Sequence, residues 1–130
     1  MINFFNSHPM FSLSASSVSN QVAMTSGCFD PNHANVSSVY EQAVNTFGVL
    51  DKQLKEMNLT KDHIIGADVW LLLRAKTEEG TPYIAPEDAK QLNKAWIEYF
   101  NDRPKPTSAT VGVGFMIPTF LVEIRFYLAN

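Results

Sequence analysis

The chain has 130 residues, of which 45% are hydrophobic, and a formal net charge of −3. That length and composition suit one globular domain with a sizeable core, so we expect a single domain over residues 1–130. The acidic balance, without a basic patch, argues against a nucleic acid as the main partner. No apolar run reaches membrane-spanning length, and Cys28 is the only cysteine, which excludes a disulfide within the chain.

The N-terminal region predicts a β-hairpin. Residues 10–16 alternate between apolar and small polar side chains, residues 16–20 are small and polar, and residues 21–27 have the composition of a second strand. The first nine residues lack a basic segment and include Pro9, so we predict no signal peptide. Together with the single cysteine, this favours a cytoplasmic protein.

The most regular helix signal lies between residues 36 and 57. Its apolar residues recur every three or four positions, which places them on one face of a helix. They are Val39, Ala43, Phe47, Leu50 and Leu54. Asn58 is a suitable end for this helix, because Asn tolerates the left-handed conformation. The apolar run at 67–74 predicts a central strand covered on both faces, with Trp70 as a packing residue.

A second helix is predicted from Pro86, because Pro suits the first helical turn and the acids Glu87 and Asp88 favour the positive end of the helix dipole. The helix should end before Pro104, since the residue before a proline avoids the helical conformation. Two strands follow, joined through Pro118. The predicted order is β-β-α-β-α-β-β, an α+β fold with two helices packed on one face of a mixed sheet.

Several segments carry a family resemblance. Residues 20–27, Asn-Gln-Val-Ala-Met-Thr-Ser-Gly, are similar to a Gly-Asn-x-x-x-x-Ser-Gly-Gln strand. Residues 92–100 are similar to a Val-Asn-x-x-Tyr-x-x-Phe-Phe helix, and Val-Glu-Ile at 122–124 is similar to a closing strand. In this order they resemble the reactive-intermediate deaminase (Rid) family, also described as YjgF-like or L-PSP endoribonuclease-like. The connection from Leu72 to Asp88 is longer than that family usually has, so its conformation stays open.

The resemblance implies a chorismate-mutase-like homotrimer whose ligand clefts lie between adjacent subunits. In the family, the Arg of a Pro-Ala-Arg triplet binds the substrate carboxylate as a bidentate pair. A nearby Glu positions the water that hydrolyses an imine, and backbone groups of the Ser-Gly strand complete the pocket. The implied partners are a small-molecule ligand and further copies of the chain, with no cofactor and no metal.

Carried over to this sequence, the family Glu is Glu123, which is our candidate catalytic residue. The triplet here is Pro-Thr-Ser, so Ser108 stands at the position of the family Arg. Thr110 stands where Cys is frequent, and Cys28 stands where Gln is usual. The candidate ligand-binding residues are Ser26, Gly27, Cys28, Lys105, Ser108, Thr110 and Arg125.

Several candidates have a structural alternative. Arg125 lies two positions after Glu123 and shares its strand face, so the two side chains could form a structural ion pair. Ser108 and Thr110 also suit the face of a strand without any further role.

The segment 26–27 could be no more than a bulge at the end of a strand. A nucleophilic Cys28 would need a neighbouring base, and no spacing places His8, His33 or His63 beside it. The same three histidines are too scattered to indicate a metal site.

These patterns support three functions, given in order of preference. The first is the binding of a small metabolite in inter-subunit clefts, without standard 2-imino-acid deamination. The second is hydrolysis of an imine or enamine, in which Glu123 activates a water. The third is the endoribonuclease activity named in the family description, against which the acidic balance counts. The first two differ in whether a cation, Lys105, Arg103 or Arg125, reaches the cleft.

Overall fold

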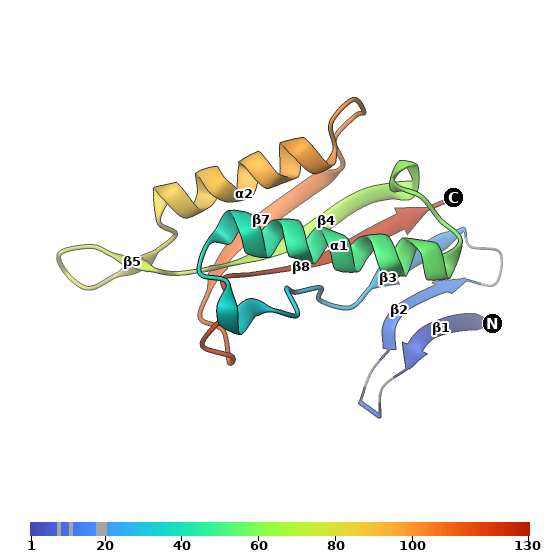
Figure 1. The fold of residues 1–130 in the computed structure, drawn as a ribbon, viewed down its shortest axis with the longest axis horizontal. Helices are drawn as coiled ribbons and strands as arrows, with labels where there is room; N and C mark the ends of the chain where they lie inside the picture. The colour runs from blue at the N-terminus through green and yellow to red at the C-terminus, as the bar shows by residue number, and fades with distance from the viewer. Residues whose placement is uncertain (8, 11, 18–20) are drawn as a thin grey trace.

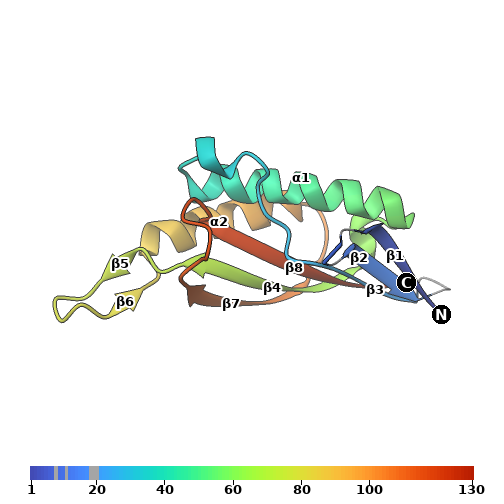
Figure 2. The ribbon, with the colours of Figure 1, turned by 90° about the horizontal axis from the view of Figure 1, so that it is seen from below.

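The computed structural model describes residues 1–7, 9–10, 12–17 and 21–130, which form an α+β fold. Two helices cover one face of a six-stranded mixed sheet (Figures 1 and 2). The strands are β1 (Ile2–Ser7), β2 (Ser12–Ser17), β3 (Val22–Thr25), β4 (Ile64–Leu72), β5 (Ala75–Lys76), β6 (Pro82–Tyr83), β7 (Thr107–Val113) and β8 (Val122–Ala129). The helices are α1 (Val39–Met57) and α2 (Pro86–Tyr99), with short 3-10 turns at His33–Asn35 and Lys61–His63. The predicted fold class is confirmed.

The sheet has the strand order β1-β2-β3-β8-β4-β7. β1, β2 and β3 form an antiparallel meander, and β8 lies between β3 and β4, antiparallel to both. β4 and β7 are parallel neighbours, and α2 connects them. α1 likewise carries the chain from β3 to β4, past the position that β8 occupies. The C-terminal strand is therefore central, and β1 and β7 are the two edges.

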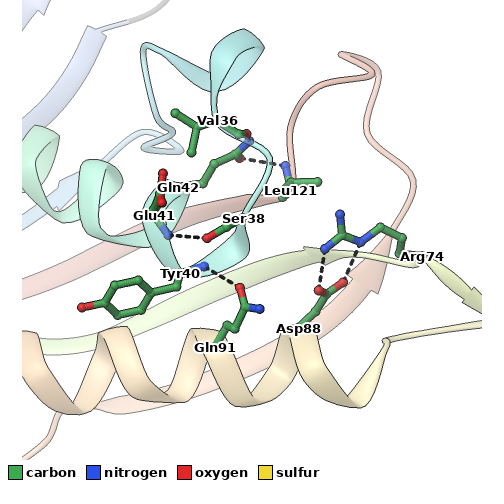
Figure 3. Close-up of polar contacts among 9 residues, drawn as sticks. All are labelled: Val36, Ser38, Tyr40, Glu41, Gln42, Arg74, Asp88, Gln91 and Leu121. Atoms are coloured by element: carbon green, nitrogen blue, oxygen red, sulfur yellow. Dashed lines mark hydrogen bonds and ion pairs between the residues drawn. The ribbon is translucent and has the colours of Figure 1, made fainter.

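α1 begins and ends where the local chemistry predicts. Ser38 is the N-cap, and its hydroxyl accepts a hydrogen bond from the Glu41 N–H at 3.1 Å (Figure 3). This cap sets the start at Val39, three residues after the predicted start. Asn58 closes the helix in the left-handed conformation, with φ of 58°. All five residues of the predicted apolar stripe are buried, which confirms that face as the core side.

α2 starts at Pro86, as predicted, and its first turn holds the buried Asp88. Arg74 donates two hydrogen bonds to the Asp88 carboxylate, at 2.9 and 2.5 Å (Figure 3). This bidentate ion pair anchors the connection between β4 and α2, which extends from the body as the small β5–β6 hairpin (Figure 2). β4 ends at Leu72, two residues before the predicted end of that strand.

β1 is a strand that the sequence did not predict. It pairs with β2 at the edge of the sheet, and its side chains are mostly exposed, so it lacks the burial pattern of an inner strand. The predicted N-terminal hairpin corresponds to β2 and β3. Residues 18–20 of its predicted turn lie outside the described residues, as does His8. Neither helix of the described chain has the length and apolar character needed to cross a membrane.

Candidate functional site

The face of the sheet opposite the helices carries the charged residues of β8. Along β8, four alternate residues are fully buried beneath the helices, and the residues between them point to the other face. The buried residues are Val122, Ile124, Phe126 and Leu128. That second set consists of Glu123, Arg125 and Tyr127, which are half-buried. We call this side of the sheet the open face.

Glu123 lies directly over Gly27. A Cβ atom placed on Gly27 would lie only 2.1 Å from Glu123 Oε2, so the close approach requires a residue without a side chain. The strand itself is irregular here. β3 pairs Met24 with Tyr127, whereas Cys28 bridges Ile124, so the β3 side has one extra residue between these two pairs. The bulge at 26–27 and the site are thus one feature, because the bulge makes room for the carboxylate.

The Glu123 carboxylate borders a hollow of about 310 Å³ at the end of the open face. The hollow is lined by Trp70, Val113, Gly114, Phe115, Met116, Ile117, Phe120 and Glu123. Glu123 is the one ionisable member of this lining, and burial raises the pKa of its carboxyl group. Across the described residues, no hydrogen bond or ion pair to this carboxylate is found. Trp70, predicted as core packing, is half-buried and forms a wall of the hollow.

The loop at 114–121 forms the lip of the hollow, and Gln42 of α1 holds it in place. The Gln42 Nε2 group donates to the Val36 and Thr119 carbonyls at 2.8 and 2.9 Å. Its Oε1 atom accepts from the Leu121 N–H at 2.9 Å (Figure 3). Gln42 is fully buried, so these bonds satisfy its whole amide. Sequence reasoning missed Gln42. Its position beside the apolar stripe of the helix was the one sign that this polar side chain is buried.

Aromatic contacts fix the same lip from outside. The Phe120 ring stacks on Phe29 with centroids 4.6 Å apart, and the His33 ring meets it edge-on at 4.7 Å. His33 Nδ1 also lies 2.5 Å from the Thr119 hydroxyl oxygen. Phe115 meets Phe120 at 5.8 Å from within the lining of the hollow. His33 is therefore a packing residue of the lip, and the lip is a built wall of the site.

Arg125 pairs with Asp68 of β4 and not with Glu123. Its Nη2 atom lies 3.3 Å from Asp68 Oδ2, and its guanidinium carbon lies 5.7 Å from the Trp70 ring centroid and 5.5 Å from that of Tyr127. The Tyr127 hydroxyl also donates to Asp68, and this bond, with the Arg125 contact, lowers the pKa of the Asp68 carboxyl. Sequence reasoning missed Asp68, although it shares with Glu123 the signal of an acid inside an apolar strand.

Ser108 and Thr110 lie apart from Glu123 within one chain. In the parallel β4–β7 pair, Ser108 is opposite Ala67 and Thr110 is opposite Val69. Ala67 and Val69 are buried on the helix side, so Ser108 and Thr110 are on that side of the exposed edge strand. Glu123 is on the open face. One chain alone does not assemble the predicted pocket.

The two remaining candidate cations also have other contacts. Arg103 forms an ion pair with Asp62 at 2.9 Å, and Lys105 donates to the Arg103 carbonyl at 3.3 Å. Like Arg125, they are therefore not partners of Glu123 in the described part of the chain.

Cys28 lies in the core at the end of β3, 5% exposed. Burial raises the pKa of its thiol to about 11, opposed by a hydrogen bond to Thr25 and reinforced by the charge of Glu123. A thiol with that pKa stays protonated at neutral pH, which argues against a nucleophilic Cys28. His63 accepts a hydrogen bond from the Thr60 N–H at 2.9 Å, so it also has a structural contact. Among the described residues, no cluster of His, Cys, Asp and Glu suits a metal ion.

A larger hollow, of about 850 Å³, lies between α1 and α2. Its polar groups already pair with one another: the Tyr40 hydroxyl donates to Glu98, and the Tyr99 hydroxyl donates to Asp51 at 2.5 Å. The Tyr99 ring stacks on Phe47 at 4.2 Å and has the Lys61 ammonium 3.8 Å from its centroid. These groups need no ligand, so the smaller hollow beside the unpaired Glu123 is the better candidate site.

Known proteins share this sequence pattern and this fold. The family model described as Endoribonuclease L-PSP matches residues 6–129. A RutC family protein of Haemophilus influenzae is 29% identical over 116 residues, which are 89% of each chain. A crystal structure of a YjgF family member from Neisseria meningitidis has a TM-score of 0.81 at 22% identity, covering 100% of this chain and 95% of that one. A Rid-family structure from Yersinia pestis has a TM-score of 0.75 at 19% identity, covering 95% and 90%. At these sequence identities, the similarity to the two crystal structures supports the fold and not a shared function.

Proposed function

The chain belongs to the Rid/YjgF family of L-PSP endoribonuclease-like proteins, and from that premise we propose that it binds a small metabolite beside Glu123. In this proposal the binding site is a cleft between subunits of a homotrimer, and the protein is not a standard 2-imino-acid deaminase. One observation carries this proposal. The Glu123 carboxylate sits over Gly27 at the edge of an apolar hollow, without a cationic partner among the described residues. Such a group is available to a ligand.

The lack of a cation argues against a 2-imino acid as the ligand. In the Rid resemblance, an Arg at the position of Ser108 would bind the carboxylate of that substrate, and a serine hydroxyl cannot replace a bidentate guanidinium. Arg103 and Arg125 are each paired with an aspartate. A carboxylate placed beside Glu123 would therefore meet a like charge without compensation.

The open face supports a trimer. Rid proteins are typically homotrimers, and the open face of this chain exposes a series of apolar side chains that a neighbouring copy could cover. They are Ile2, Phe4, Leu13, Val22, Met24 and Val111. Light scattering should report three times the chain mass of 14.6 kDa. A monomer at micromolar concentration would remove the cleft and the proposal with it. We further propose that residues 1–130 act as one domain in the cytoplasm.

Hydrolysis of an imine is the second candidate, because burial raises the pKa of the Glu123 carboxyl group above its ordinary value, which favours proton exchange with a water. Endoribonuclease activity ranks third, since neither the net charge of −3 nor the apolar lining of the hollow favours a phosphate backbone.

An imine-hydrolysis assay tests the proposal. The protein should hydrolyse 2-aminoacrylate no faster than the buffer does. Turnover at a rate ordinary for enzymes, about 1–1,000 per second, would show that a cation of the assembled protein has replaced the family Arg and that the protein is a deaminase. If turnover is found, the Glu123→Gln variant distinguishes a catalytic from a structural role of Glu123. Loss of turnover with unchanged stability supports the catalytic role. The matched control is Glu78→Gln, the same change on the exposed β5–β6 hairpin.

A further inference from the structure

We propose that the hollow beside Glu123 takes a compact apolar ligand that carries a primary ammonium group and no carboxylate. This inference rests on the proposed function and names the class of its ligand. Three properties of the hollow support it: its charge, its wall and its size.

The charge of the hollow comes from one side chain. Glu123 is the only ionisable residue of the lining and lacks a partner in the described part of the chain. The half-buried Glu123 carboxylate is partly removed from water without a partner, and an N–H donor that carries a positive charge supplies both the charge and the hydrogen bond. Arg125, the cation on the same strand face as Glu123, is paired with Asp68. A cationic ligand therefore completes the site, whereas an anion would add a second unpaired charge.

The wall of the hollow is aromatic. Trp70 is the register partner of Glu123 across the β4–β8 pair, so its indole lies beside the carboxylate. Phe115 and Phe120 contribute further rings, and their mutual contact at 5.8 Å keeps the wall continuous. Aromatic faces attract ammonium groups, and tryptophan does so most strongly. The same wall stabilises an apolar group attached to the ammonium.

The size of the hollow limits the ligand. A volume of about 310 Å³ is at the lower end of the range of roughly 300–1,000 Å³ found for small-molecule sites. The part of the site that this chain supplies therefore accommodates one ring with a short substituent beside Glu123. The lip is held by the Gln42 hydrogen bonds to Leu121 and Thr119, so the hollow does not widen freely.

Three probes of similar size test the charge preference: the cation benzylammonium, the neutral benzyl alcohol and the anion benzoate. The intact protein, labelled with 15N, is titrated with each probe at pH 7, and the indole N–H signals of its two tryptophans are followed. Trp70→Phe assigns the Trp70 signal. We expect benzylammonium to shift that signal with an affinity about tenfold or more above that of benzyl alcohol, because a hydrogen bond to a charged donor is the stronger one. Benzoate should not bind.

Variants test whether Glu123 causes the charge preference of the hollow. In Glu123→Gln, benzylammonium and benzyl alcohol should bind equally well, whereas Glu78→Gln should keep the tenfold difference. If benzyl alcohol or benzoate binds the wild-type protein as tightly as benzylammonium, the hollow remains a ligand site and the charge preference is refuted. If no probe moves the Trp70 signal, or only the Trp96 signal moves, both this inference and the hollow as a small-molecule site fail. If Glu123→Gln does not fold, the three probes on the wild-type protein still decide the charge preference.

Discussion

Replacing Gly27 with alanine should displace the Glu123 carboxylate and leave the fold intact. The new Cβ atom would lie 2.1 Å from Oε2 and 2.7 Å from the carboxyl carbon, whereas ordinary contacts begin near 3.4 Å. The carboxylate must therefore move by more than about 1 Å. The atoms in conflict are the end of a flexible side chain, so rotation of Glu123 relieves the overlap without moving the backbone.

The cost to stability should be small. Gly27 does not have the left-handed φ that disfavours alanine, since Gly80 is the only glycine with a positive φ in the described chain. A Gly→Ala change at a compatible position stabilises by about 0.4–1 kcal/mol through the unfolded chain. An off-rotamer Glu123 costs about 0.5–1.5 kcal/mol, so the two terms nearly cancel. The free energy of unfolding should change by less than about 1 kcal/mol.

The effect on binding should be large. Loss of a charge-assisted hydrogen bond costs about 1.5–3 kcal/mol, which is about 10–100-fold in affinity. Benzylammonium titration of Gly27→Ala, followed through the Trp70 signal, measures this loss. The matched control is Gly48→Ala in α1, where an added Cβ has no neighbour within 4 Å. That variant should keep wild-type affinity and gain up to about 1 kcal/mol of stability from helix propensity. Wild-type affinity in Gly27→Ala would show that Glu123 does not bind the ligand from a position over Gly27.

Four further predictions concern single groups. Because the pKa of Cys28 is about 11, its reaction with a disulfide reagent at pH 8 should be roughly 100-fold slower in the folded protein than in urea, and an equal rate would contradict its burial. Arg74→Ala should lower the free energy of unfolding by about 1–3 kcal/mol in urea titrations, because it leaves the buried Asp88 carboxylate without its partner. An unchanged urea midpoint would show that water replaces the Arg74 guanidinium as the partner of Asp88. Gln42→Met should cost a similar amount by stranding a buried backbone N–H, and it should also weaken benzylammonium binding by loosening the lip. Burial raises the folded-state pKa of Glu123 above its ordinary value of 4.5, so the native state binds the proton more tightly than the unfolded state does. The free energy of unfolding should therefore fall as the pH rises above 4.5, and Glu123→Gln should remove that fall. Identical pH profiles for the variant and the wild-type protein would refute the raised pKa.

The helices could be predicted from the sequence because their signals are local. The stripe from Val39 to Leu54 and the stop at Asn58 lie within one segment, and the same holds for Pro86 at the start of α2. β1 could not be predicted in this way. Its pairing with β2 at the edge of the sheet is a tertiary contact that leaves little burial pattern in residues 2–7.

The site was predictable only as separate residues. Glu123 stands out as an acid in an apolar strand, but its contact with Gly27 joins positions 96 residues apart and depends on the bulge in β3. The pairing of Arg125 with Asp68 likewise depends on the β4–β8 register, which the sequence does not reveal. The separation of Ser108 from Glu123 follows from a further pairing, that of β4 with β7.

A crystal structure of the assembled protein tests the central claim most directly. The account predicts three copies of the chain, with the Glu123 carboxylate of one copy facing a cleft bordered by the edge strand of another, at Ser108. It also predicts that no lysine or arginine nitrogen of any copy lies within about 4 Å of that carboxylate, the usual limit for an ion pair. A guanidinium or ammonium group seated on Glu123, or an assembly that leaves Glu123 outside any shared cleft, would contradict it.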